Sequence, residues 1–494
     1  MNKPTAFPTE QVLFAAFMSF AVYLLIAAFY SGIKRERAYL KNGALDKGDN
    51  FFVVWALAAA LVIRLVLSYY IVGHKTDINC FTAWGGRVAA VGFKNFYDGF
   101  ADYPPGYIYV LGLMSKISTA FGHGIYAADG SYDAVCVALT KLPSILADIA
   151  SAYLVFRLAR KKLRFIPSAL LMLMIAFNPL LAYVSGGWGQ IDQILTVLLV
   201  GSILLLTYNK PILGGIVYGL AILMKPQALM AGPLMAIAYM LYVFDDNFFK
   251  AAGCECKDNR SVRFLKTCAA VVCAILLIIV TAIPFASDKM PWYEIILEKY
   301  LGTATSYKYA SVNAYNLYSL VGANWKRIDT VAFKGINYGQ LGTFGMVVSV
   351  AFGGLLYLFG RKHNPGALPL AAAYTFAGLF TVGHYMHERY LVPSLLLLMV
   401  AYIMYSDKRL LWTFLAYTLT LSVNCFAAFY YSELFEYGLY WDERIVFWCS
   451  LANVLVFAAF TVVCVMIMIK NKISSDAFID EPFERGIEPA KTAN

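Results

Sequence analysis

The chain has 494 residues, of which 60% are hydrophobic and 14% are charged, and its mean hydropathy is +0.64. The charged share is about half that of ordinary globular proteins, which excludes a soluble enzyme, a disordered chain and a repeat solenoid and predicts an all-α polytopic membrane protein. The 40 Lys and Arg residues outnumber the 30 Asp and Glu residues, and we expect this excess on cytoplasmic loops rather than at a nucleic-acid interface.

Thirteen apolar segments are predicted to be transmembrane helices, each of which needs about 20 residues. In chain order these segments are 11–30, 52–72, 135–158, 165–184, 190–208, 211–224, 228–244, 265–285, 341–360, 366–383, 389–405, 410–429 and 445–469. One further apolar run, 106–121, carries Lys116 and begins at Pro104-Pro105-Gly106.

The basic loops decide whether 106–121 crosses the membrane, because Lys and Arg concentrate on the cytoplasmic side. Basic residues collect in 31–51, 157–164 and 245–264, and at the turns 361–362 and 408–409. All of these loops fall on one side only if 106–121 does not cross. We therefore predict that 106–121 dips into the outer surface or lies along it, with the amino terminus outside and the carboxyl terminus in the cytoplasm.

This topology divides the chain into three parts. Residues 1–51 form an extra N-terminal transmembrane helix and a basic cytoplasmic loop, residues 52–469 form the main transmembrane domain, and residues 470–494 form a cytoplasmic tail. Two large outer loops, 73–134 and 286–340, belong to the main domain. The expected location is the cell membrane.

The first outer loop carries two acidic groups at expected helix starts. Asp77 closes the sequence His-Lys-Thr-Asp, and Asp102-Tyr103 precedes the two prolines. Each carboxylate is either a helix N-cap or a group held at a membrane-edge cavity, where it can take a proton. Two acidic helix starts in one loop favour a shared site.

More polar groups lie at the outer ends of later spans. Trp188, Gln190 and Asp192 follow two glycines, and they either suit a sugar, as a stacking face, an amide and a carboxylate, or form an interfacial Trp and a helix cap. Lys225 closes a short apolar span on the outer side, where it either snorkels or binds an anion.

The outer turn after residue 383 combines His384, His387, Glu388 and Arg389. The two histidines are spaced to share a metal ion on one helix face, but no third ligand is obvious. A phosphate clamp by Arg389 and a histidine fits better, because a guanidinium binds phosphate bidentately. Arg64 and Asp148 lie deeper in the predicted spans. We expect them to form a structural ion pair, and the alternative is a proton path through the membrane.

Acids, cations and sugar-compatible groups therefore gather on one outer face. Cations beside a membrane indicate a lipid phosphate or pyrophosphate, and carboxylates indicate base catalysis on a hydroxyl. The sequence has no Gly-rich phosphate loop and no Ser-His-Asp order. This argues against an ATP-driven or nucleotide-sugar enzyme, and we expect no cofactor.

Seven stretches, in this order, resemble the GT-C superfamily of integral-membrane glycosyltransferases, most of all the bacterial relatives of the second GPI-anchor mannosyltransferase. These stretches are DINCFTAW (77–84), FYDGFADYPPGYIY (96–109), KLPSILAD (141–148), WGQID (188–192), KPQA (225–228), SVNAYNL (311–317) and HERY (387–390). A weaker likeness extends to the endoplasmic-reticulum glucosyltransferases that extend lipid-linked oligosaccharides.

The resemblance implies a GT-C-like bundle of about 13 transmembrane helices, with two large outer loops that carry membrane-edge helices. It implies transfer of a sugar, mannose first, from a polyprenyl-phosphate donor on the outer side, with inversion at the anomeric carbon. Asp77 is then the general base, and Lys225, His387 and Arg389 bind the donor phosphate. The acceptor is a lipid, a glycan or a protein.

Ten further residues are then expected to bind substrate. They are Asp102, Tyr103, Trp188, Gln190, Asp192, Asn313, Tyr315, Asn316, His384 and Glu388, of which the three at 313–316 close over the site. The family's double-acid pattern is absent, because Ile78 follows Asp77, and we predict no metal.

Two other functions share these features. A flippase or transporter of lipid-linked sugars needs a polar path through the membrane centre, for which Arg64 and Asp148 are the deep charges. A surface-polysaccharide polymerase or ligase uses a sugar chain on a lipid pyrophosphate.

Overall fold

The structure is a computed structural model that describes residues 23, 47–248, 250–253, 257–302, 307–434 and 442–477. Most of the predicted span 11–30 and the tail beyond Ala477 therefore lie outside the described residues. Tyr23 is described, and its buried hydroxyl donates to Oγ1 of Thr418 at 3.4 Å.

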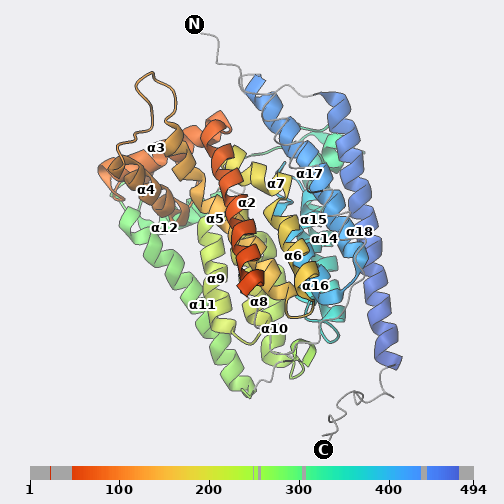
Figure 1. Ribbon diagram of the computed structural model, residues 1–494. Coiled ribbons are helices and arrows are strands. Elements are labelled where there is room, and N and C mark those ends of the chain that lie inside the picture. The colour runs from red at the N-terminus through yellow and green to blue at the C-terminus, as the bar shows by residue number, and fades with distance from the viewer. Residues whose placement is uncertain are drawn as a thin grey trace, which may run out of the picture.

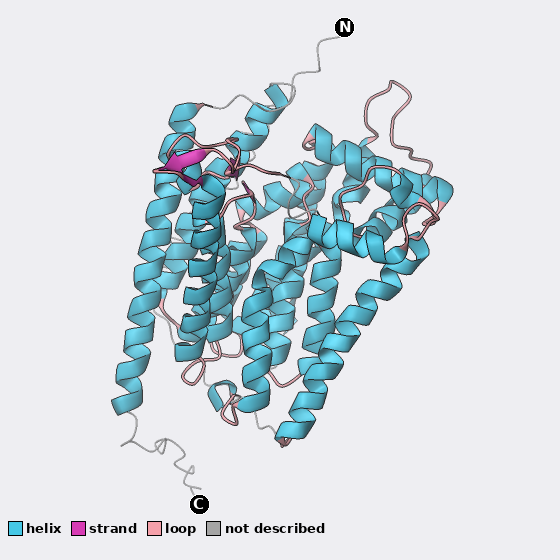
Figure 2. Cartoon of the chain, turned by 180° about the vertical axis from the view of Figure 1, so that it is seen from behind, coloured by secondary structure: helices cyan, strands magenta, loops and turns pink. Residues whose placement is uncertain are grey.

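The described chain is almost entirely helical, which confirms the prediction of an all-α polytopic membrane protein (Figures 1 and 2). Seven helices are long and apolar enough to cross a membrane: α2 (Lys47–Tyr70), α5 (Ala134–Ala159), α10 (Gly232–Phe244, extended by the preceding 3₁₀ turn Pro226–Ala231), α11 (Arg260–Ala282), α14 (Tyr338–Gly360), α17 (Lys408–Leu434) and α18 (Glu443–Ala477). Helices α6 (Phe165–Ala176) and α7 (Pro179–Ala182), the latter continued by the π-helical turn Tyr183–Trp188, are together long and apolar enough for one bent span or a re-entrant loop, with a bend of 40° between them.

Four apolar helices are shorter: α8 (Asp192–Thr207), α9 (Pro211–Met224), α15 (Ala367–Val382) and α16 (Val392–Tyr405). They have 14 to 16 residues and are therefore about 21–24 Å long, whereas the hydrocarbon core of a bilayer is about 30 Å thick. Each predicted span after the first thus coincides with a helix, but four of these helices are too short to reach both membrane surfaces when straight.

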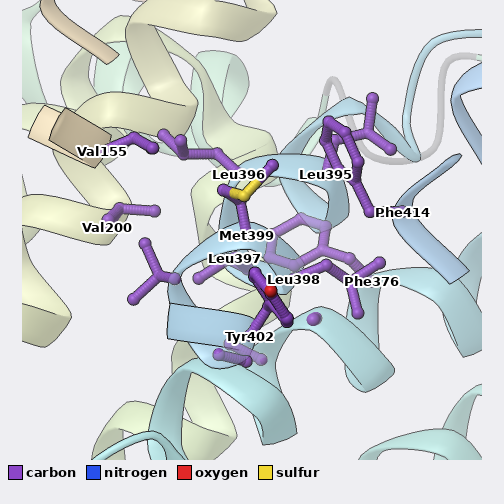
Figure 3. Close-up of a cluster of buried hydrophobic side chains, with 14 of the residues drawn as sticks. Val155, Val200, Phe376, Leu395, Leu396, Leu397, Leu398, Met399, Tyr402 and Phe414 are labelled. Carbon is purple, nitrogen blue, oxygen red and sulfur yellow. The ribbon is translucent and has the colours of Figure 1, made fainter. Parts of the chain in front are cut away.

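Helix α16 is apolar on all sides and lies in the middle of the bundle. All its residues from Val392 to Met404 are buried, as expected of a helix without a polar face. Figure 3 shows its side chains packed against Val155 of α5, Val200 of α8, Phe376 of α15 and Phe414 of α17. This core holds the short helices in place.

Helices of the two segments that were predicted to be outer loops lie together at one end of the bundle. They are α3 (Lys75–Val91), α4 (Pro105–Ala120) and α12 (Trp292–Leu297), and the connection between α10 and α11 lies at the opposite end (Figure 1). Helix α4 packs on α3, α5 and α9 and corresponds to the run 106–121, which was predicted not to cross. Pro105 occupies its first turn, where a missing N–H costs no hydrogen bond.

The second outer loop also contributes short pieces at this end. Helix α13 (Leu317–Leu320) follows strand β1 (Ser311–Val312), which pairs in parallel with β4 (Met386–His387). Strands β2 (Val331–Phe333) and β3 (Ile336–Asn337) form an antiparallel hairpin and are visible at the end of the bundle in Figure 2. Helix α18 continues to Ala477, eight residues into the segment predicted as tail.

The deep pair Arg64 and Asp148 joins α2 to α5. Nε of Arg64 donates to Oδ2 of Asp148 at 2.7 Å, and both side chains are buried. Nη1 of Arg64 also donates to the carbonyl of Ala176 at 2.6 Å, which is where the bent span breaks. The predicted structural ion pair is therefore present, and it stabilises the junction of three helices.

We expect Arg64→Met to lower the free energy of unfolding by about 3–5 kcal/mol, because it leaves Asp148 buried without its cation. Thermal unfolding of the purified protein in detergent measures the effect. The double variant with Asp148→Leu removes both charges and should recover much of the loss. Equal stability of wild type and Arg64→Met would contradict the structural role.

Candidate active site

The segment 183–192 carries three of the predicted site residues, and one face of α5 holds it. Lys141, Ser144 and Asp148 lie three and four residues apart, on one side of that helix. Oγ of Ser144 donates to the carbonyl of Gln190 at 2.6 Å, and Oγ of Ser185 donates to Asp148 at 2.5 Å. Side chains of the stretch KLPSILAD (141–148) therefore hold the segment that contains WGQID (188–192) in place.

Lys141 is fully buried, and its ammonium group binds backbone carbonyls. Nζ donates to Ile71 at 2.6 Å, to Gly187 at 2.7 Å and to Gly186 at 3.1 Å. It thereby connects the end of α2 to the π-helical turn. Gly73 lies at the same junction with φ at 100°, and a Cβ there would lie 2.5 Å from the carbonyl oxygen of Trp188.

Asp77 lies in the first turn of α3 and faces the π-helical turn Tyr183–Trp188. Nε1 of Trp188 donates to its Oδ2 at 2.8 Å, and Nε2 of Gln190 donates to the same oxygen at 2.6 Å. Both donors use Oδ2, so these hydrogen bonds leave Oδ1 to receive a proton. The side chain is 27% exposed, which allows a substrate hydroxyl to reach it.

Asp192 begins α8 and is the carboxylate of a buried ionic cluster. Nζ of Lys225, at the end of α9, donates to its Oδ1 at 2.8 Å. Nε of Arg389, just before α16, lies 3.4 Å from its Oδ2. Arg389 also pairs with its neighbour Glu388, and Lys225 lies 5.3 Å from the ring centre of Tyr390.

Trp188 connects the carboxylate of Asp77 to this cluster. Its indole N–H donates to Asp77, and its ring lies 5.5 Å from Cζ of Arg389 in a cation–π contact. One side chain therefore fixes both a candidate base and a candidate phosphate ligand.

Asp102 and Tyr103 approach the same place from the loop before α4. Burial raises the pKa of Asp102, and the nearby charge of Asp77 raises it further, while Lys299 and Arg389 oppose the shift. Tyr103 lies near the charges of Arg389 and Asp192. The two carboxylates of the first outer loop therefore share one site.

His387 reaches the site through the pairing of β4 with β1. Burial lowers the pKa of His387 well below its ordinary value, and the charges of Arg389 and Lys225 lower it further. The imidazole is therefore neutral at neutral pH, and the cations beside it are Arg389 and Lys225. Tyr307 lies against it, with ring centres 5.0 Å apart.

Four predicted site residues have other contacts. Asn313 accepts from Nε1 of Trp325 at 2.9 Å, and the amide of Asn316 donates to the carbonyl of Phe380 at 3.0 Å while its oxygen caps α13. The backbone N–H of Tyr315 donates to Asn424 at 2.9 Å. These three residues attach the second outer loop to the bundle, and Asn313 also forms a backbone bridge with His387. None of the three has a described side-chain contact with Asp192, Lys225 or Arg389.

The fourth, His384, faces α14. Its Nε2 lies 3.2 Å from Oγ1 of Thr343, and Gly342 lies directly against its ring. With Tyr385 and Gln340, His384 lines a shallow groove at the outer end of α14. It belongs to the predicted turn but not to the charged cluster.

Sequence reasoning gave no role to several residues that shape the site: Lys141, Ser144, His74 and Tyr307. Lys141 and Ser144 belong to the stretch KLPSILAD (141–148). Lys141, Ser144 and Asp148 follow the spacing i, i+3, i+7, which places them on one face of a helix, and this spacing was the available signal. His74 adjoins Asp77 in the sequence. Nothing in the sequence indicated Tyr307. It reaches the site because strand β1 pairs with strand β4, about 75 residues later in the chain.

Among the described residues, no three His, Cys, Asp or Glu side chains converge to hold a metal ion. Residues 99–297 match the sequence profile of the ALG6, ALG8 glycosyltransferase family, and no curated protein matches the chain. The matched region contains Asp102, Lys141, the 183–192 segment and Lys225. The match supports a GT-C glycosyltransferase acting on lipid-linked sugars, and it gives no support to the mannosyltransferase relatives in particular.

We expect Lys141→Met to destabilise the protein and to impair activity, because three carbonyls lose a buried donor. The cost is roughly 1–3 kcal/mol for each carbonyl that finds no other partner. Thermal unfolding in detergent and transfer activity are measured together, with Lys116→Met, an exposed lysine of α4, as the matched control. Equal behaviour of the two variants would contradict the role of Lys141.

Proposed function

We propose that the protein is an inverting glycosyltransferase. It moves a sugar, with mannose as the first candidate, from a polyprenyl-phosphate donor to an acceptor on the extracytoplasmic side of the membrane. The acceptor is a lipid, a glycan or a protein. The profile match of residues 99–297 supports the reaction class, and the arrangement around Trp188 supports the mechanism.

The observation that carries the proposal is the shared contact of Trp188 with Asp77 and Arg389. Displacement at an anomeric carbon needs a base for the incoming hydroxyl and positive charge at the leaving phosphate. Here one indole contacts both residues, Asp77 through its N–H edge and Arg389 over its ring. In the proposed reaction a candidate base and a candidate phosphate ligand are thus held against the same side chain, close enough to act on one substrate.

In this mechanism Oδ1 of Asp77 takes the acceptor hydroxyl proton while the oxygen forms its bond to the anomeric carbon. The bond from that carbon to the phosphate oxygen breaks, and the leaving lipid phosphate gains negative charge. Lys225 and Arg389 stabilise that charge inside a buried cluster, where electrostatic interactions are strong. Neutral His387 donates a hydrogen bond to the phosphate.

The carboxyl group of Asp102 and the hydroxyl group of Tyr103 are placed to orient sugar hydroxyls. Asp192 acts differently, because it is the counter-ion of Lys225 and Arg389. It keeps both cations in position before the donor arrives. The transporter alternative relied on Arg64 and Asp148, which are paired with one another, so no described contact of these two favours a polar path.

We expect Asp77→Asn to reduce sugar transfer by at least about 100-fold while donor binding stays close to that of wild type. Asparagine keeps the shape and accepts the bonds from Trp188 and Gln190, but it cannot take the proton. The assay uses purified protein in liposomes with radiolabelled polyprenyl-phosphate mannose and a membrane lipid extract.

The control for this experiment is Asp129→Asn, an exposed acid of the first outer loop. Full transfer by Asp77→Asn would disprove the role of Asp77 as base. Labelled donor that crosses the bilayer without transfer would favour a flippase. If mannose is not transferred, the same test continues with glucose and arabinose donors.

We expect Arg389→Gln to weaken donor binding by about 10–100-fold, the typical effect of a hydrogen bond to a charged group. His387→Gln should weaken binding less, because His387 is neutral at neutral pH. Equilibrium binding of the labelled donor measures both, with the exposed Arg327→Gln as control. A larger loss in His387→Gln than in Arg389→Gln would contradict the assignment of charge.

A further inference from the structure

We propose that His74 is a positioning residue that orients Asp77 through its imidazole Nδ1–H. The inference rests on the proposed function of Asp77 as the base. Nδ1 of His74 lies 3.5 Å from Oδ2 of Asp77. It is buried and has no hydrogen-bond partner among the described residues. A buried polar nitrogen without a partner is costly, and here it faces a carboxylate.

The imidazole ring is held at this place by aromatic contacts. It stacks on Trp188, with ring centres 5.9 Å apart and planes 22° apart, and Phe429 of α17 contacts it with ring centres 6.3 Å apart. Trp188 is the residue whose indole N–H binds Asp77. The ring of His74 and the carboxylate of Asp77 are therefore fixed against the same indole.

The backbone position gives a second reason to expect a role. His74 occupies the N-cap of α3, where a side chain ordinarily accepts a hydrogen bond from the first helical N–H groups. His74 makes no such bond, although its carbonyl accepts from the N–H of Ile78 at 2.9 Å. The imidazole is thus directed to Asp77 instead of to the helix end.

These contacts define what the imidazole does. With the proton on Nδ1, the ring is a third N–H donor toward Oδ2, beside Trp188 and Gln190. A distance of 3.5 Å is too long for a hydrogen bond, and catalytic hydrogen bonds often tighten only in the substrate complex. Three donors on Oδ2 fix the carboxylate plane, so that Oδ1 meets the acceptor hydroxyl. No bond is made or broken at His74.

Two substitutions separate the donor from the ring. His74→Asn keeps an N–H donor near the position of Nδ1 and loses the stacking. His74→Phe keeps the stacking and loses the donor. If His74 positions Asp77, we expect His74→Phe to lower kcat about tenfold or more without changing donor KM, and His74→Asn to keep most of the activity. The reverse order of the two variants would show a packing role only and would overturn the proposal.

A measurement without turnover distinguishes failure of this inference from failure of the proposed function. A hydrophobic carbodiimide modifies carboxyl groups, and peptide mapping follows its rate at Asp77. Loss of an N–H donor should make Asp77 react several-fold faster in His74→Phe than in wild type or in His74→Asn. Equal rates in all three proteins would overturn the proposal, whatever substrate the enzyme uses. Absence of transfer with every donor would instead count against the proposed function.

Discussion

The site depends on one buried carboxylate, Asp192, which is shared by two buried cations. Lys225 ends one helix and Arg389 precedes another, and each would be unfavourable in this place without a counter-charge. Asp192, at the start of α8, lies within 3.4 Å of both. Because Asp192 joins the ends of three helices, it holds the side chains of both cations at one place in the bundle.

The charges of the cluster come from the ends of short helices. Among the described residues, α8, α9, α15 and α16 are shorter apolar helices of 14 to 16 residues, and each has one end at the cluster or at the turn beside it. The turn after α9 carries Lys225 and the turn between α15 and α16 carries Arg389, so both cations reach Asp192 from helix ends.

The sequence predicted the helices well, and several of the residues that it proposed for the site lie together in the structure. Length and hydropathy located the described helices of the predicted spans, and the distribution of Lys and Arg predicts that α4 does not cross. Asp77, Asp102 and Arg389 were proposed because charged groups are unusual in or near apolar segments, and Trp188 was proposed because an amide and a carboxylate follow it within four residues. The sequence does not show which polar side chains form hydrogen bonds with the backbone. Asn316 and Lys141 both donate to backbone carbonyls, and only the fold reveals these partners.

The two acids of the first outer loop are not equivalent, and their surroundings distinguish their roles. Burial and the neighbouring charge of Asp77 raise the pKa of Asp102, so its carboxyl group retains a proton more readily and can donate to a sugar oxygen. Asp77 receives two N–H donors on one oxygen, and these compensate the charge of a carboxylate. In the proposed mechanism such a difference divides the work of acid and base between the two residues. Asp77 takes the proton in that mechanism, and it is also the residue that Trp188 links to Arg389.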